Sequence, residues 1–195
     1  MMQYLIWGSA TLPVGAVRDG GAHALASGEM LVLEGPWPLA PTSLAYLAAD
    51  DKLAGLAPLA KETAGAFAVE GFAAPSDGRA FVIAAHKMRD AAAFRPYAEA
   101  IPALLARFGV RSLARGGKVT PLAGSFVPDR GVVLEFPSVE AVLDFYMSDV
   151  YAPLLALRLR TTDPRFVVLS REGTIPTSVR ARADAFLRAR EGAAP

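Results

Sequence analysis

The sequence predicts an α+β fold made of two unequal halves, and three observations support this class. In the second half, short apolar runs of strand length alternate with segments whose apolar residues recur every three or four positions, as on one face of a helix. A linker of small residues at 73–78 (AAPSDG) separates this half from the first. Glycines and large apolar residues of the first half recur in the second at a constant spacing, which indicates a worn internal repeat.

The composition is that of an ordinary globular chain. Of its 195 residues, 53% are hydrophobic and 20% are charged, so the chain can bury a substantial core and has no signature of disorder. No apolar stretch approaches the roughly 18 residues of a membrane helix, and no basic residue precedes the apolar start, so we expect neither a membrane anchor nor a secretory signal. The lack of cysteine excludes disulfides, thiol nucleophiles and zinc–thiolate sites. These features favour a cytoplasmic location.

The net charge of +1 conceals an asymmetry between the two halves. Residues 1–77 carry three basic and eight acidic side chains, whereas residues 78–195 carry 17 basic and 11 acidic ones. Opposite charge favours docking of the halves and fixes its orientation. A basic half can also meet nucleic acid, but its arginines are spread singly and no cluster of aromatic and basic residues accompanies them. We therefore expect no nucleic-acid partner.

The second half begins with a strand and a helix. Residues 80–85 (AFVIAA) form an apolar run typical of a buried strand. Asp90 is placed to cap a helix whose apolar stripe runs to Phe108, and Gly109 stands where helices commonly end. Pro96 and Pro102 interrupt this stripe, which predicts a kink or a late start of the helix.

The rest of the second half completes a β-α-β-β-α-β order. Strands are expected at 110–115, from the break at 116–117 to Leu122, at 131–136 and at 166–170. Between the last two strands, Ser138 is placed to cap a helix with Glu140 in its first turn, and a second helical piece follows residues 148–149 and runs to about Leu159. This order is the ferredoxin-like, or split βαβ, arrangement, and we assign it to residues 78–173.

The first half, residues 1–73, is interpreted as a degenerate copy of the same unit. The evidence is the set of matching positions Gly28 and Gly117, Leu33 and Leu122, Gly35 and Gly124, and Trp37 and Phe126. The segment between the first expected strand, residues 4–7, and Gly21 is too short for a strand connection with a helix, so the first repeat is expected to lack its first helix.

A basic amphipathic helix is expected at the C-terminal end, over residues 176–191. Thr177 or Ser178 can cap it, and Val179, Ala183 and Phe186 share one face. We expect this helix to pack back on the acidic first repeat, near the place of the missing helix, because a sheet left uncovered would expose apolar surface. The alternative is a frayed basic tail.

Motifs of residues 79–173 resemble a bacterial family, the domain of unknown function numbered thirteen-thirty in the dimeric α+β barrel superfamily. They are 113–117 (LARGG), 133–138 (VLEFPS), 146–151 (YMSDVY) and the pair Leu157-Arg158. The resemblance implies a four-stranded antiparallel sheet per repeat and two sheets facing each other, here as a pseudo-dimer within one chain. Relatives in the superfamily include cofactor-independent oxygenases, muconolactone isomerase-like enzymes and heme-binding proteins, but a shared fold does not transfer activity.

Five residues are the candidates for a functional site. Arg115 and Glu135 lie on neighbouring predicted strands, where a carboxylate and a guanidinium could bind a polar ligand group or take part in proton transfer; the alternative is a structural ion pair. His86 could act as a general base at neutral pH or could simply be a solvated strand end. Tyr151 and Arg158 follow the family pattern and are expected to line the cleft.

The functional prediction keeps two classes open. The sequence has no glycine-rich phosphate loop, no GxSxG elbow and no HExxH motif, and no carboxylate stands near His86 or His23 at metal-ligand spacing. One hypothesis is an oxygenase- or isomerase-like enzyme that uses neither metal nor organic cofactor, with Glu135 or His86 as base and Arg115, Tyr151 and Arg158 as ligand-binding residues. The other is a non-catalytic ligand-binding or assembly module. Whether the built-in dimer pairs again stays open.

Overall fold

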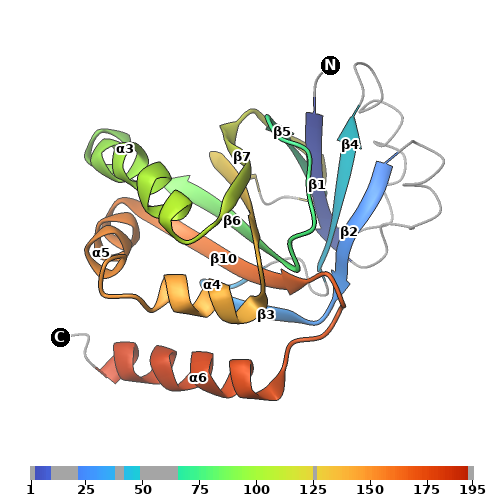
Figure 1. Ribbon diagram of the computed structural model, residues 1–195. Helices are drawn as coiled ribbons and strands as arrows, with labels where there is room; N and C mark the ends of the chain where they lie inside the picture. The colour runs from blue at the N-terminus through green and yellow to red at the C-terminus, as the bar shows by residue number, and fades with distance from the viewer. Residues whose placement is uncertain (1–2, 10–21, 38–41, 49–65, 125–126, 193–195) are drawn as a thin grey trace.

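The computed structural model describes residues 3–9, 22–37, 42–48, 66–124 and 127–192. These residues form two antiparallel five-stranded sheets and four helices, which confirms the predicted α+β class (Figure 1). Within these ranges, no helix is long and apolar enough to cross a membrane.

Each sheet takes four strands from one half of the chain and a fifth from the other. Sheet A has the order β2 (Ala22–Gly28), β4 (Thr42–Ala48), β1 (Gln3–Ser9), β5 (Ala66–Gly71) and β8 (Val119–Ala123). Sheet B has the order β3 (Met30–Glu34), β10 (Thr162–Ser170), β6 (Ala80–Met88), β9 (Arg130–Phe136) and β7 (Arg111–Gly117). The fifth strands, β8 and β3, exchange across the two halves.

Glycines mark two of the places where the chain passes from one sheet to the other. Between β2 and β3, Gly28 has a φ of 118°, and a side chain there would collide with the backbone of Gly173. At the end of β7, before the chain crosses to β8, Gly116 has a φ of 75°, and a side chain on Gly117 would collide with the carbonyl of Glu70. Only glycine combines this backbone freedom with so close an approach. The break expected at residues 116–117 lies slightly later, because β7 runs through both glycines and β8 begins at Val119.

Two helices of the second half, α3 and α4, begin at the predicted caps. α3 (Ala91–Arg107) starts after Asp90, whose carboxylate accepts a hydrogen bond from the amide of Ala93 at 2.9 Å. Pro96 and Pro102 lie inside this helix, so the expectation of a late start is wrong. α4 (Val139–Tyr146) is capped by Ser138. α5 (Ala152–Thr161) follows one turn later, and α6 (Thr177–Gly192) ends the described chain.

Two apolar cores separate three layers of the molecule. One core lies between the sheets and is built from both halves, with Trp7 and Phe67 of sheet A facing Phe81 and Val133 of sheet B. The other lies between the opposite face of sheet B and helices α3, α4 and α5, as Figure 1 shows. The inner strands β6, β9 and β10 of sheet B are therefore buried on both faces over much of their length, which explains their apolar runs.

α6 packs beside α4 and against β3, on the side of sheet B that the helices cover (Figure 1). Val179 and Ala183 are buried there, and Arg180 pairs with Glu29 at 3.2 Å. α6 thus contacts the first half through β3 and Glu29, although β3 belongs to sheet B, and it contacts α4 of the second half as well. β3 has crossed to that sheet and brings the acidic partner of the helix with it. The segment expected to lack a helix lies largely outside the described residues.

Candidate functional site

A row of five residues crosses sheet B on the face toward the helices. The strand register places Glu34 opposite Phe166, Phe166 opposite Ala84, Ala84 opposite Val132, and Val132 opposite Arg115. Neighbouring strands lie about 4.8 Å apart, so the two charged ends of the row are separated by roughly 19 Å of backbone. The row therefore has a carboxylate at one edge of the sheet, an arginine at the other and apolar residues between them.

A pocket lies along this row, between the sheet and helices α3 and α5. Its cavity volume is about 30 Å³, which is room for roughly two water molecules. The walls are mainly apolar and aromatic, and six polar side chains reach into it. These polar residues are His86, Tyr97, Arg115, Arg130, Tyr151 and Arg158. Four of the five residues selected from the sequence, His86, Arg115, Tyr151 and Arg158, are thus brought together.

Two arginines at the β7 edge of the pocket have no acid partner. Arg115 and Arg130 are both half-buried, and across the described ranges no carboxylate forms an ion pair with either of them. The guanidinium of Arg130 lies against Gly116 and 5.6 Å from the ring centre of Phe94. Burial, together with the neighbouring charge of Arg115, lowers the pKa of Arg130. This end of the pocket is therefore suited to an anion.

His86 lines the pocket and lies opposite Arg130 in the register of β6 and β9. Only 2% of its surface is exposed, and its Nδ1 has no hydrogen-bond partner. Burial lowers the pKa of His86 well below 6.5, and the charges of Arg158 and Arg130 lower it further. The imidazole is therefore neutral at physiological pH, and an unprotonated ring nitrogen can accept a hydrogen bond. The expectation of a solvated strand end is wrong.

The β3 end of the pocket holds two opposite charges that pair with each other, while Glu34 Oε2 and Arg158 Nε have no hydrogen-bond partner among the described residues. Glu34 and Arg158 form an ion pair whose side chains are each 1% exposed. The same Glu34 oxygen accepts a hydrogen bond from the Tyr146 hydroxyl at 2.5 Å, and Arg190 of α6 donates to that hydroxyl at 3.0 Å. Burial by itself would lower the pKa of Arg158, but the Glu34 carboxylate raises it above its ordinary value. Arg158 is therefore a cation whose charge is already balanced.

Two tyrosines close the pocket between its ends. The hydroxyl groups of Tyr97 on α3 and Tyr151, just before α5, lie 3.4 Å apart. Burial raises the pKa of Tyr151 well above 10.0, so its hydroxyl stays protonated and can donate a hydrogen bond. The guanidinium of Arg158 lies 5.9 Å from the ring centre of Tyr151 and 5.2 Å from that of Phe166. These aromatic rings hold the arginine in place.

The fifth predicted residue, Glu135, lies elsewhere, and its expected pairing with Arg115 is wrong. The register places Glu135 opposite Arg111, while Arg115 is opposite Val132. Side chains alternate along a strand, so Glu135 points away from the face that carries Val132 and the pocket. Glu135 therefore lies outside the pocket for two reasons: it is farther along β9, and it points to the opposite face of sheet B.

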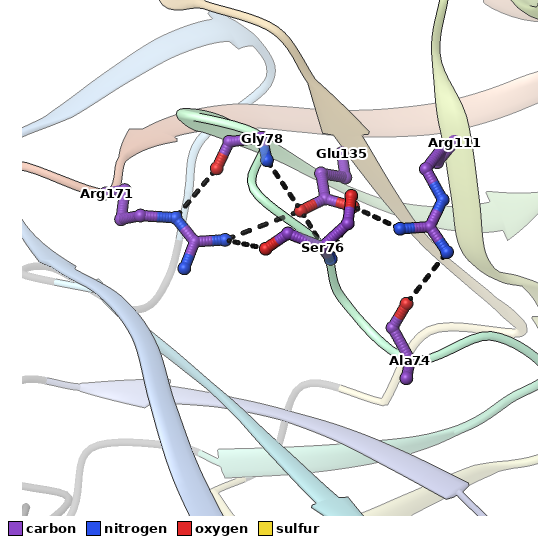
Figure 2. A network of polar contacts seen from close by, with 6 residues as sticks. All are labelled: Ala74, Ser76, Gly78, Arg111, Glu135 and Arg171. Atoms are coloured by element: carbon purple, nitrogen blue, oxygen red, sulfur yellow. Dashed lines mark hydrogen bonds and ion pairs between the residues drawn. The ribbon is translucent and has the colours of Figure 1, made fainter.

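A set of structural contacts saturates the Glu135 carboxylate, as Figure 2 shows. Its two oxygens accept hydrogen bonds from the amides of Ser76 and Gly78 and from the Ser76 hydroxyl, at 2.9–3.1 Å. Arg111 and Arg171 approach it at 3.3 and 3.4 Å. Both arginines also bond to backbone carbonyls of the linker. This network fastens the linker between the halves to sheet B, which agrees with the structural interpretation of the residue.

Sequence reasoning did not select Arg130 and Glu34. The alternation of strand residues could have indicated Arg130, because it lies two positions before Val132 and so on the same face. Glu34 ends an apolar run in the first half, and no local pattern connects it with Arg158. Along the described segments, no group of three or more His, Asp or Glu side chains is placed to hold a metal ion.

Comparisons with known proteins identify the second half. Residues 79–171 match the family described as "Domain of unknown function (DUF1330)". The resemblance inferred from the motifs of this half is thereby confirmed. No curated protein matches the chain.

Solved structures support the fold. A protein titled as a major regulator of staphylococcal pathogenesis is similar, with a TM-score of 0.50 and 11% identity over 86% of this chain and 98% of that one. Another, described as a glycine cleavage system transcriptional repressor, has a TM-score of 0.32 and 8% identity over 87% of this chain and 96% of that one. At these identities the first likeness concerns the fold alone, and the second carries no argument.

Proposed function

We propose that the pocket binds a small organic anion with an apolar body. Residues 79–171 match a family without an assigned function, so the proposal rests on the pocket itself. One observation carries this proposal: Arg115 and Arg130 lie together at an apolar pocket, and no carboxylate in the described part of the chain pairs with them. Two partly desolvated cations side by side are unfavourable until an anion joins them.

The chemistry of the pocket favours a carboxylate or enolate ligand. Guanidinium groups bind planar oxyanions with two parallel hydrogen bonds, which gives orientation as well as affinity. The remaining walls are formed by Ile101, Leu105, Val132, Leu134 and other apolar side chains. Such walls bury hydrocarbon and reject a strongly hydrated ion. A ligand that satisfies both parts has one anionic group and a small apolar body.

For catalysis, His86 is our candidate for the base. Its unpartnered Nδ1 lies in the same pocket as the two arginines, whereas every oxygen of Glu135 is already occupied. The step would transfer a proton from an acidic C–H or O–H group of the ligand to His86, and the negative charge left on the ligand would face the arginines. An isomerase needs only this removal and return of a proton. An oxygenase would additionally need O₂ to react with the carbanion.

We also propose that the two halves are copies of one β-α-β-β-α-β unit, paired as a dimer within the chain. Reading β1, β2, β4 and β5 as equivalents of β6, β7, β9 and β10 gives both sheets the same strand order, with β3 and β8 as exchanged fifth strands. The crossing points agree as well: Gly28 packs on the turn after β10, and Gly117 packs on the end of β5. In this interpretation the second copy carries the pocket.

Isothermal titration calorimetry with butyrate, hexanoate and benzoate tests the ligand proposal. We expect binding to the wild-type protein and a loss of affinity of about tenfold or more in Arg115→Ala and Arg130→Ala, because each removes a charge-assisted hydrogen-bond donor. Arg188→Ala is the matched control, since Arg188 is an exposed arginine of α6 outside the pocket. Its affinity should equal that of the wild type.

The competing function is a structural or assembly module that holds no ligand. The small cavity of about 30 Å³ favours this alternative. It would be supported if none of the three carboxylates bound to the wild-type protein. If Arg188→Ala weakened binding as much as the two pocket variants did, the carboxylates would be binding through general charge attraction and not in the pocket.

A further inference from the structure

The two ends of the pocket differ in charge, and a residue of the first half causes the difference. We infer that Glu34 determines the charge of the ligand: it cancels Arg158, so that the pocket selects a monoanion over a dianion of the same length. This inference rests on the proposed function and adds to it the class of ligand. It also makes the first half a contributor to the site, since Glu34 comes from β3.

Geometry explains why Arg158 is not available to an anion. Its guanidinium lines the pocket, but it is ion-paired with Glu34, and each of the two side chains is only 1% exposed. Tyr146 donates a second hydrogen bond to the same carboxylate oxygen and helps to fix it. A ligand carboxylate placed here would meet the negative charge of Glu34 and a cation that is already neutralised.

The opposite end of the pocket has no such compensation. Arg115 and Arg130 extend from β7 and β9, across the sheet from Glu34. Between the ends, the row is formed by Phe166, Ala84 and Val132, none of which carries a charge. The pocket therefore offers one place for an anionic group, at the arginine end, and requires a neutral group at the other.

Glu34 can be tested as a specificity-determining residue with butyrate and succinate, which have four carbons each and one or two carboxylates. Calorimetry at pH 7.5 should find that the wild-type protein binds butyrate more tightly than succinate. In Glu34→Gln the shape is kept, but Arg158 becomes an unpaired cation. We expect the affinity for succinate relative to butyrate to rise about tenfold or more. The reason is that the unpaired cation of Arg158 can then form a buried ion pair with the second carboxylate of succinate.

A double variant separates this effect from general damage to the fold. Adding Arg158→Met to Glu34→Gln removes the freed cation and leaves a neutral pair, a kind of replacement that buried ion pairs commonly tolerate. The gain in succinate binding should disappear, and the preference for butyrate should return. If Glu34→Gln alone does not fold, the double variant must still prefer butyrate.

The outcomes distinguish the two proposals. If the wild type binds butyrate but Glu34→Gln leaves the ratio unchanged, or if the double variant binds succinate as well as butyrate, the role of Glu34 is overturned and the anion pocket remains. If the wild type binds neither probe, the proposed function is wrong, and the inference about Glu34, which rests on it, is wrong as well.

Discussion

Strand β9 carries two arginine-rich environments on opposite faces, and they differ in whether charge is balanced. On one face, Glu135 is 2% exposed and surrounded by two arginines and the backbone amides of the linker. On the other face, Arg130 lies beside Arg115 with no acid partner in the described part of the chain. A saturated buried charge contributes to the architecture, whereas unbalanced charge in a pocket is left for a ligand.

This comparison explains why Glu135 was an attractive but misleading candidate. A buried carboxylate next to arginine is found at many active sites, and it is found equally in structural pairs. What separates the two cases is the number of acceptor positions still open. Glu135 has no open acceptor position, because Ser76 and Gly78 already donate hydrogen bonds to both of its oxygens, in addition to the contacts with the two arginines.

The largest effect on stability is expected for Glu135→Gln, which would disrupt the saturated network on one face of β9. The substitution places an amide group against backbone N–H donors and leaves Arg111 and Arg171 without their anion. We expect the free energy of unfolding to fall by about 3 kcal/mol, the scale for removing one member of a buried pair. Urea denaturation followed by circular dichroism measures it, and carboxylate binding by the folded fraction should not change.

Glu99→Gln is the control for this variant, because Glu99 is an exposed carboxylate in an i, i+4 pair with Arg95 on α3. Its loss should cost no more than about 0.5 kcal/mol. Equal destabilisation by the two variants would show that Glu135 is not a structural anchor.

Much of the fold could be predicted from the sequence because its signals are local. Asp90 and Ser138 cap helices through their own side chains, and the apolar run that begins at Ala80 forms a strand buried on both faces. The position of α6 could not be predicted in the same way. It depends on β3 crossing to sheet B, a non-local pairing with β10 that no nearby residue indicates.

The candidate site was predicted in part for the same reason. His86, Arg115, Tyr151 and Arg158 were selected one by one, and the fold brings them together. The pairing of Arg115 with Glu135 failed because it depends on the register of β7 against β9, which places Glu135 opposite Arg111 and, after one bulge, Arg115 opposite Val132. A one-residue shift moves a side chain to the other face of a sheet, so adjacency in the predicted strand order was not enough.

Burial of His86 in the pocket should make the stability of the folded protein fall at acidic pH. In the unfolded chain this histidine takes up a proton near pH 6.5, but in the folded protein its pKa is well below 6.5, chiefly because of burial. Below pH 6.5 the unfolded state therefore binds more protons, and stability falls as the pH falls. The loss is about 1.4 kcal/mol per pH unit until the lowered pKa is reached.

The free energy of unfolding at pH 7.5 and pH 5.5 measures this loss. His86→Gln should lose less stability between the two values than the wild type, since the group that titrates is gone. His23→Gln is the matched control, because His23 is the only other histidine and is exposed on β2. Identical pH dependence in wild type and His86→Gln would contradict a buried neutral imidazole.

The smallest effect on stability is expected at the other face of β9, where Arg115 and Arg130 have no balancing charge among the described residues. Arg130 is half-buried beside Arg115, and its contact with the ring of Phe94 offsets only part of the repulsion. Arg130→Gln should therefore leave the free energy of unfolding unchanged or raise it by up to about 1 kcal/mol at low ionic strength, where screening is weakest. Added sodium chloride should stabilise the wild type more than the variant. A loss of 2 kcal/mol or more, comparable with Glu135→Gln, would mean that this arginine too is a structural residue, on the scale expected for buried charges.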